Sequence, residues 1–355
     1  MKKILVLGAG KIGLAVATML HETGDYGVSI GDAAFADAEG NASEGIARLR
    51  IDVGDTQALK QALLHFEAVV SALPFYLCLK VAEVARETGV HYVDPTEDVQ
   101  TARAIRLLAE GANTAFVPQC GLAPGFVAIV ANHLVGQFDE PQDVKLRVGA
   151  LPQFPDNALK YNLTWSTDGL INEYCNPCEV IADGARGVTA PLDGVEHFSF
   201  DGAEYEAFAT SGGVGSLCET LAGRVRSLSY KTIRYPGHRD MVKMLVDDLH
   251  LCRRRDVFKD LIEHGIPTTK QDVVIIFVTV RGLKGGQLTQ DSYAKKIYGA
   301  ATDRRWSAIQ LTTASAICAV VDLLSSGKLP AGGFVKQEQI AFADFVANRF
   351  GKIYG

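Results

Sequence analysis

Short apolar runs alternate with segments of helical spacing along the first third of the chain. The runs predict strands at residues 3–7, 27–32, 46–53, 68–73, 91–94 and 114–119. Apolar residues recur at helical spacing between most of them, at 14–22, 56–64, 75–89 and 97–111. Strands that alternate with helices form a parallel sheet covered on both faces. This part of the chain therefore predicts an α/β domain with a doubly wound parallel sheet of the Rossmann type.

The pattern changes after about residue 140. Strand-like runs separated by turns occur at 143–151, 158–165, 178–183, 195–200, 203–210, 227–237, 272–286 and 287–299, and helical runs at 216–223 and 238–252. They predict a second, α+β domain with a mostly antiparallel sheet, large enough for a homodimer interface. Two further helices are predicted at 303–327 and 333–351. We expect a domain at 1–122 completed by 304–355, and a substrate and dimerisation domain at 123–303.

Composition narrows the class of protein. The chain has 355 residues, which is more than single cores usually reach, and a net charge of -6, which argues against nucleic-acid binding. The apolar N-terminal stretch is interrupted by Lys11 and lacks a clear cleavage site, so it does not predict a signal peptide. No uninterrupted apolar segment of about 20 residues occurs, and no membrane span is expected.

The cysteines suggest a reducing compartment. There are seven of them, an odd number, scattered along the chain. For a chain of this size the pattern predicts free thiols and a cytoplasmic protein rather than a disulfide framework. Cys175 and Cys178 form a lone CxxC, a redox pair or half a zinc site in other contexts. No second such pair accompanies it, so no metal site is predicted.

The first turn of the predicted sheet carries a phosphate-binding motif. Gly8, Gly10 and Gly13 follow the first strand, with Lys11 and Ile12 between the last two. The first glycine permits the tight turn, the second lets backbone approach a diphosphate, and the third lets helix and strand pack closely. These residues predict a dinucleotide site at the helix N-terminus.

The second predicted strand ends in an acidic residue. Asp32 stands where a carboxylate would accept a hydrogen bond from the adenosine ribose, and the competing interpretation is a turn cap. Ala33 and Ala34 follow it, so no cation is at hand in the sequence for a 2′-phosphate. The prediction is NAD rather than NADP.

The later strand ends should line the redox part of the dinucleotide, because ligands of such sheets lie beyond the carboxyl ends of the strands. Ala72, Leu73 and Pro74 end the fourth strand and should contact the nicotinamide. Cys120 and Gly121 end the sixth strand and should form the opposite wall.

Several stretches resemble one family. They are "VVSALPFYLCLKVAEVARETGVHYVDPTED", "PQCGLAPGFVAIVANHL", "NLTWSTDGLINEYCNPCEVIADG" and "TIRYPGH". They resemble saccharopine dehydrogenase-like enzymes, and together they are most similar to the NAD-dependent members that oxidise the ε-amino group of lysine. The resemblance implies a Rossmann domain, a second domain for substrate and dimerisation, and an active site between them.

The reaction implied by the resemblance is oxidation of a CH–NH2 group, then hydrolysis of the imine to a semialdehyde with release of ammonia. It needs a proton acceptor and an anion or dipole near the developing cation. Asp94, at the end of the fifth strand, is the first candidate, and its alternative role is a turn-forming residue before Pro95. Thr96 would assist by hydrogen bonding. Cys120 would be a wall or weak donor rather than a nucleophile.

The second domain should supply substrate recognition. Trp165 and Ser166 resemble a pocket-lining segment, although Trp165 fits a core position equally well. Arg234 would bind the substrate carboxylate, or else be a surface charge at a strand end. His238 is the candidate proton shuttle, because an unperturbed imidazole titrates near neutral pH.

Two other functions stay open. One is a saccharopine- or carboxynorspermidine-type enzyme acting on a secondary amine, whose extra carboxylates need more arginines than the motifs provide. The other is a non-catalytic protein that senses NAD or serves in assembly, since the glycine motif and Asp32 fit binding alone.

Overall fold

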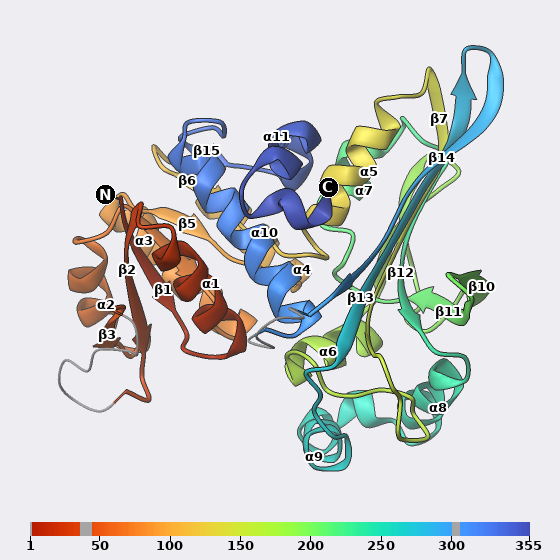
Figure 1. Ribbon diagram of the computed structural model, residues 1–355, viewed down its shortest axis with the longest axis horizontal. Helices are drawn as coiled ribbons and strands as arrows, with labels where there is room; N and C mark the ends of the chain where they lie inside the picture. Colours follow the sequence, from red (N-terminus) through yellow and green to blue (C-terminus); the bar gives the residue numbers. More distant parts are fainter. Residues whose placement is uncertain (1, 36–44, 300–305) are drawn as a thin grey trace. The chain divides into compact units, whose positions relative to one another are not determined.

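The computed structural model of the protein describes residues 2–35, 45–299 and 306–355 (Figure 1). Contacts divide the chain into unit 1, Met1–Phe126 with Thr312–Gly355, and unit 2, Val127–Leu311. The chain thus leaves and re-enters unit 1 within helices α5 (Phe126–Val135) and α10 (Ala308–Ser325). The predicted boundary at 303–304 and the predicted start of the helix at 303 lie outside the described residues.

Unit 1 is built on a parallel sheet, as the alternating pattern predicts. Its strand order is β15-β6-β5-β4-β1-β2-β3 among the described residues, and every described pair of neighbours is parallel. The strands are β1 (Lys2–Leu7), β2 (Tyr26–Asp32), β3 (Ala47–Arg50), β4 (Ala68–Ser71), β5 (His91–Val93), β6 (Ala115–Val117) and β15 (Gly333–Phe334). Because all of them run the same way, their carboxyl ends share one edge of the sheet.

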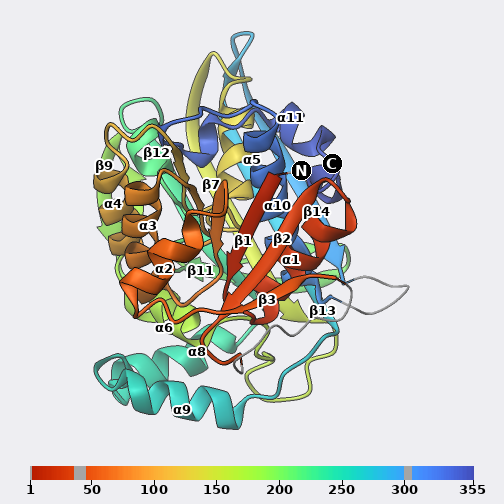
Figure 2. The same ribbon diagram turned by 90° about the vertical axis from the view of Figure 1, so that its left-hand side faces the viewer.

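Helices cover both faces of this sheet. Helices α2 (Thr56–Leu63), α3 (Phe75–Thr88) and α4 (Val99–Leu108) pack on one face around a core that includes Leu5, Val69 and Tyr92 (Figure 2). Helix α1 (Lys11–Glu22) packs against β2 and α10, and the Cys318 thiol of α10 contacts the Val16 carbonyl of α1. Asp55 caps α2, and its carboxylate accepts hydrogen bonds from the amides of Gln57 and Ala58.

Unit 2 contains the second sheet, which is mostly antiparallel, with β12 and β7 as its parallel pair in the described chain. Its main path is β10-β11-β12-β7-β13-β14; off this path, β8 pairs with β12, and β9 pairs with β8. The strands are β7 (Glu140–Pro152), β8 (Cys178–Ala182), β9 (Ala185–Thr189), β10 (Glu196–Phe200), β11 (Ala203–Ala209), β12 (Ser227–Arg234), β13 (Asp272–Lys284) and β14 (Gln287–Tyr298).

The helical segments of unit 2 gather mainly at one end of this sheet, where Figure 1 shows α6, α8 and α9 at the bottom of the view. They are α6 (Thr167–Cys175), α7 (Leu217–Leu221), α8 (His238–Lys243), η1 (Met244–Asp248), η2 (Leu251–Arg253) and α9 (Arg255–Gly265). Apolar residues of α6 and α9 share one buried cluster with Leu251 of η2. The segments α6, α8, η1, η2 and α9 all contribute to this cluster and thus pack together in unit 2.

Helix α10 is long and apolar. By length and composition alone it could cross a membrane, and among the described residues it is the one helix of which this holds. Most of the helix, 67%, is buried inside the protein. That burial is typical of a core helix.

Three predicted elements are wrong. Residues 333–351 do not form one helix but β15, a short helical turn η3 (Gln337–Gln339), helix α11 (Phe342–Ala347) and a turn η4 (Gly351–Tyr354). The first residues of this segment pair with β6 at the edge of the sheet, and the Val335 amide donates to the Phe116 carbonyl. The predicted strand at 158–165 has a single bridge, between Leu163 and Thr268. The predicted helix 238–252 is divided into α8, η1 and η2. In addition, the sequence pattern did not predict helices α6 and α9.

Candidate functional site

The glycine loop of unit 1 has the shape that a dinucleotide requires. Gly8 has φ +99°, and a Cβ there would lie 2.7 Å from the Ala72 carbonyl oxygen. A Cβ on Gly13 would lie 1.8 Å from the Gly8 carbonyl oxygen, so only glycine lets α1 pack this close to β1. Around Gly10, by contrast, no atom lies within 4 Å of such a Cβ. The space before α1 is therefore open to a ligand.

Helix α1 offers backbone donors to that space. Gly10 is its N-cap residue, no side-chain hydrogen bond caps the helix at Gly10, and Lys11 and Ile12 are the first two helical residues. Helix N-termini of this kind bind phosphates through their N–H groups and dipole. The residues present thus fit a diphosphate.

Asp32 lies at the end of β2, beside the glycine loop. Its Oδ2 accepts a hydrogen bond from the Ala9 amide at 2.7 Å, and its Oδ1 from the Ala34 amide at 2.9 Å. The carboxylate is half-buried and keeps lone pairs toward solvent. This placement fits a ribose hydroxyl donor.

The neighbouring strand supplies a cation that the sequence pattern did not single out. Arg50 of β3 is paired in register with Asp32, although it is 18 residues away in the numbering. Arg48, also on β3, lies with its guanidinium 5.4 Å from the centre of the Phe35 ring. The sequence feature that could have indicated this cation is the pair of arginines on the predicted strand that follows β2 along the chain. This cation bears on the choice between NAD and NADP.

Asp94 follows β5 at the same carboxyl edge and is fully buried. Its Oδ1 accepts hydrogen bonds from the amides of Thr96 at 2.7 Å and Gln119 at 3.3 Å. Its Oδ2 has no partner within hydrogen-bond distance. Burial raises the pKa of Asp94 to about 6, and the nearby Tyr92 hydroxyl and the two amides offset part of that rise.

Cys120 is joined to Asp94 through the backbone. Its amide donates to the Asp94 carbonyl oxygen at 2.9 Å, and its thiol donates to the same oxygen at 3.1 Å. Burial, reinforced by the Asp94 charge, holds the pKa of this thiol well above its ordinary value. Cys120 therefore stays protonated, as expected for a wall residue and not for a nucleophile.

The other strand-end candidates lie on the same edge. Ala72 follows β4, where its amide donates to the Leu7 carbonyl oxygen, and Pro74 is the N-cap residue of α3 after Leu73. Gly121 follows Cys120, and its carbonyl accepts from the Phe126 amide at the start of α5. Thr96 is buried, with its hydroxyl 3.4 Å from the Asp98 amide. The structure thus brings the candidates of unit 1 to one edge.

The candidates of unit 2 meet around two tyrosines that the sequence did not single out. Arg234, at the end of β12, is 2% exposed, and its Nε donates to the Tyr174 hydroxyl at 3.2 Å. Its guanidinium lies 4.8 Å from the centre of the Tyr161 ring and 3.8 Å from Glu173 Oε2. Arg234 is therefore a buried, partnered cation and not a surface charge.

The prediction of His238 as a proton shuttle loses its basis. Burial, with the Arg234 charge, lowers the pKa of His238 to about 3. The ring is neutral at working pH, and its Nδ1 lies 2.8 Å from the Leu159 carbonyl oxygen, which can only accept. Nδ1 therefore carries the proton, and Nε2 accepts from the Tyr174 hydroxyl at 3.0 Å. Both ring nitrogens are used in holding unit 2 together.

Trp165 and Ser166 lie next to this cluster. Ser166 is the N-cap residue of α6, where its hydroxyl accepts from the Gly169 amide at 3.2 Å. Trp165 is half-buried against the core that contains Tyr161 and Tyr174. The polar atoms Tyr161 Oη, Asn162 Oδ1 and Thr164 Oγ1 of the preceding segment are buried without a hydrogen-bond partner. Buried polar atoms of this kind can hydrogen-bond to water or to a ligand.

One cysteine prediction is wrong. Cys175 is bonded to Cys252 in a disulfide, whereas Cys178, the other member of the CxxC, is a buried thiol. The bonded pair is separated by 77 residues, and the contact of α6 with η2 brings the Cα atoms to 5.5 Å. No spacing along the sequence could show that pairing. Among the described residues, no group of three His, Cys, Asp or Glu side chains is arranged to hold a metal ion.

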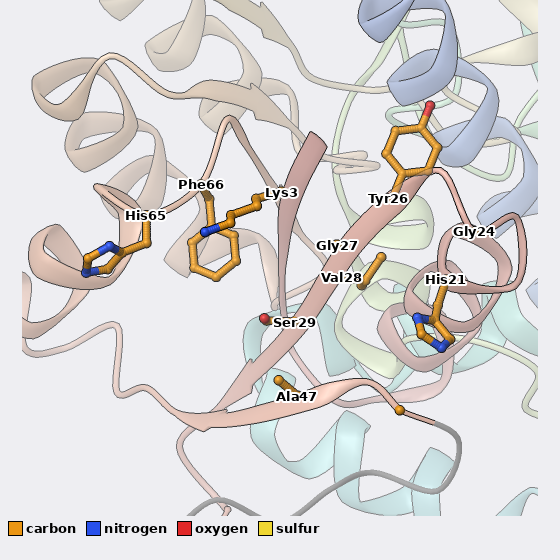
Figure 3. Close-up of a pocket in the computed structure, with 11 residues that line it drawn as sticks. Lys3, His21, Gly24, Tyr26, Gly27, Val28, Ser29, Ala47, His65 and Phe66 are labelled. Carbon is orange, nitrogen blue, oxygen red and sulfur yellow. The ribbon is translucent and has the colours of Figure 1, made fainter. Parts of the chain in front are cut away.

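A separate hollow lies at the opposite edge of the unit 1 sheet. Figure 3 shows its lining, which comes from the first residues of the strands, including Lys3 and Ala47, and from the nearby side chains of His21, His65 and Phe66. Its volume is about 350 Å³. Because ligands of parallel sheets bind beyond the carboxyl ends, this hollow is distinct from the dinucleotide site.

Comparisons with known proteins identify two family domains. Residues 4–116 match the family model "Saccharopine dehydrogenase NADP binding domain", and residues 121–352 match "Saccharopine dehydrogenase C-terminal domain". Unit 1 thus contains a nicotinamide dinucleotide-binding domain, which is what the glycine loop indicates.

Two curated relatives are distant from this chain in sequence. "Saccharopine dehydrogenase [NADP(+), L-glutamate-forming]" of Saccharomyces cerevisiae is 24% identical over 260 residues, 69% of this chain and 58% of the relative. "Alpha-aminoadipic semialdehyde synthase, mitochondrial" of Mus musculus is 23% identical over 258 residues, 67% of this chain and 27% of the relative. The chain therefore spans less than two thirds of the length of either relative.

Solved structures share the fold. Apo saccharopine dehydrogenase (L-Glu forming) from Saccharomyces cerevisiae superimposes with a TM-score of 0.79 at 17% identity, over 97% of this chain and 96% of that one. The DAP dehydrogenase of C. glutamicum, in complex with DAP, gives 0.51 at 11% identity, over 98% and 99%. At these identities the likeness concerns the fold alone.

Proposed function

Because the chain belongs to the saccharopine dehydrogenase family, we propose that it is an NAD-dependent oxidoreductase that acts on the CH–NH2 group of an amino acid. The proposed reaction is that of L-lysine 6-dehydrogenase, in which the ε-amino carbon of L-lysine is oxidised. Hydrolysis of the imine then gives the cyclising semialdehyde and ammonia. The homodimer and the cytoplasmic location expected from the sequence stay predictions.

The observation that carries the proposal is the Asp94 carboxyl group. It is fully buried, its Oδ2 has no partner, and its pKa is raised to about 6 by burial. Above that pH the carboxylate is a buried anion whose Oδ2 accepts no hydrogen bond. A substrate ammonium or iminium would balance its charge. A group of this pKa also accepts a proton at near-neutral pH. Asp94 thus supplies both functions that amine oxidation asks of a side chain.

The dinucleotide, when bound, supplies the hydride acceptor of this reaction. The chain's own part is to hold it: the open space before Gly10 fits the diphosphate, and Asp32 fits the ribose. Asp32 favours NAD, since a 2′-phosphate would meet its negative charge. The name of the matching domain model points to NADP instead, and Arg50 beside Asp32 is the residue through which NADP would be tolerated.

Unit 2 is proposed to recognise the amino-acid end of the substrate. Arg234 is its candidate for the carboxylate, and the unfilled polar atoms of 161–164 are candidates for the remaining hydrogen bonds. Lys160, a second cation near this segment, donates to the Pro236 carbonyl oxygen at 2.9 Å. Arg234 is thus the buried cation of this cluster, which favours a substrate with few carboxylates.

The substitution Asp94→Asn tests the proposal. We expect turnover with NAD and lysine to fall by roughly 10²–10⁴-fold, because a general base and counter-charge are lost. Binding of NADH, followed by its fluorescence, should change little. Asp98→Asn is the matched control, since Asp98 caps α4 and asparagine caps equally well. Unchanged turnover in Asp94→Asn would remove Asp94 from the mechanism.

A secondary-amine substrate is the second candidate. The names of the yeast relative and of the superimposed yeast structure favour saccharopine. The products separate the two: lysine oxidation releases ammonia, whereas saccharopine cleavage releases an amino acid. Assaying both products with each amine, NAD and NADP therefore decides the substrate. NADH binding without oxidation of any amine would favour the non-catalytic, NAD-sensing function.

A further inference from the structure

The disulfide of unit 2 stands apart from the other cysteines of the chain. Cys175 is the last residue of α6, Cys252 lies in η2, and both are half-buried. The five remaining cysteines are buried thiols. Among the cysteines, this pair is therefore the one that has exposed surface.

The buried thiols are chemically protected. Burial raises the pKa of Cys178 to about 12 and that of Cys218 to about 12. Burial raises the pKa of Cys78, Cys120 and Cys318 as well. A thiol with a raised pKa is a poor nucleophile, so none of these groups competes in thiol–disulfide exchange. This holds for Cys178 too, even though it lies three residues from Cys175.

The disulfide fastens a contact that is otherwise non-covalent. Arg255, at the start of α9, donates to Asn172 Oδ1 of α6 and to Asn176 Oδ1, each at 2.6 Å. Lys259 of α9 pairs with Asp168 of α6 at 2.7 Å, with both side chains roughly one-third exposed. An exposed pair of this kind contributes little stability. Apolar packing of α6 with α9 persists without the bond, so reduction would loosen α6 and not unfold it.

Helix α6 connects this bond to the candidate substrate residues. It begins at the N-cap Ser166, directly after Trp165, and near its end it carries Glu173 and Tyr174, which contact Arg234. The rigidity of α6 therefore bears on the geometry of that whole cluster. We propose that Cys175–Cys252 is a reversible thiol–disulfide site through which a dithiol reductant lowers the affinity of unit 2 for its amine substrate. The statement about the substrate rests on the proposed function, whereas the statement about the site does not.

The exchange is balanced by the reductant. One thiolate of a dithiol attacks a sulfur of the pair, and the other cysteine leaves as a thiolate that takes up a proton. The second thiol of the reductant then breaks the mixed disulfide. Two electrons pass to the protein, which gains two thiols, and the reductant becomes a disulfide. An oxidised dithiol reverses the reaction.

The site itself is tested without any activity. Under denaturing, non-reducing conditions we expect five titratable thiols, and seven after reduction. A tryptic digest should contain peptide 161–186 linked to peptide 244–253, and fragmentation should place the bond at Cys175 and not at Cys178. Seven thiols in protein that has been treated with oxidised dithiol would overturn the proposal.

The effect on unit 2 is tested by comparing oxidised protein, reduced protein and Cys252→Ser. We expect faster hydrogen exchange at residues 167–175 in the reduced and substituted forms, and a KM for the amine that is about five-fold higher or more. NADH binding should not change. The control Cys178→Ser should keep the linked peptide and the low KM.

The outcomes separate the two proposals. Equal exchange and equal KM in oxidised and reduced protein would overturn a regulatory role. Altered exchange in a protein that binds NADH but oxidises no amine would contradict the proposed function and leave the redox site standing.

Discussion

Replacing Asp94 should make the protein more stable while it removes activity. The pKa of this carboxyl group is raised from 3.8 to about 6 in the folded protein, chiefly by burial. A raised carboxyl pKa means that folding favours the protonated form. Its contribution to stability is thus fully present below pH 3.8, and it is lost as the pH rises through about 6.

The magnitude follows from the shift. At 1.36 kcal/mol for each pKa unit, ionised Asp94 costs about 3 kcal/mol of unfolding free energy above pH 7. The asparagine side chain of Asp94→Asn cannot ionise, and its carbonyl can still accept from the amides of Thr96 and Gln119. Its buried NH2 group takes the place of Oδ2, which has no partner, and that offsets part of the gain. We expect Asp94→Asn to be more stable than wild type by roughly 1–3 kcal/mol at pH 8.

The assay is denaturant unfolding of both proteins without dinucleotide between pH 5 and pH 8. The advantage of Asp94→Asn should grow by about 1 kcal/mol over this range, because wild type loses stability as its carboxyl group ionises. Asp98→Asn, whose cap is preserved, should follow wild type. A difference between Asp94→Asn and wild type that is the same at every pH would refute the reasoning, since the carboxyl group would then have an ordinary pKa in the fold.

Three further substitutions test the dinucleotide site. Asp32→Ala should weaken NADH binding and shift the ratio of NADH to NADPH affinity toward NADPH by about ten-fold or more. The reason is that the charge that opposes a 2′-phosphate is gone and Arg50 remains. An unchanged ratio of affinities in fluorescence titrations would contradict this role of Asp32. Gly10→Ala and Gly13→Ala should differ: the first meets no neighbour and should lower NADH affinity in a normally folded protein, whereas the second places a Cβ 1.8 Å from the Gly8 carbonyl oxygen and should lower the melting temperature as well. Equal melting temperatures for these two variants would count against the packing argument.

Local patterns were enough to predict most of unit 1. The glycine turn and the parallel direction of the strands follow from spacing and from residue types that act within a few positions. The helix predicted at 333–351 was wrong because a distant contact decides the structure of this segment. Its apolar spacing suits a helix, yet Phe334 is paired with Phe116 of β6, a partner more than 200 residues away, and such pairing overrides local preference.

Unit 2 was less predictable because its important contacts are distant in sequence. Residues 158–165 alternate like a strand, but Tyr161 and Thr164 turn to a buried polar cluster. The assumption that His238 has an ordinary imidazole pKa was wrong, because its burial beside Arg234 cannot be inferred from a motif. The disulfide joins residues 77 apart, and only the contact of α6 with η2 shows it.

The two units therefore answer different parts of the functional question. In a parallel sheet all strands end at one edge, so Gly8, Asp32, Asp94 and Cys120, scattered over 113 positions, can be assigned to one site from the strand pattern alone. A mixed sheet has no such edge, and the Arg234–Tyr174–His238 chain becomes visible only in three dimensions. The substrate recognition that we propose depends on that second kind of cluster. Substitutions in unit 1 can therefore test whether an amine is oxidised. To show why one amine is preferred, unit 2 variants are needed whose preference changes from lysine to a larger amine.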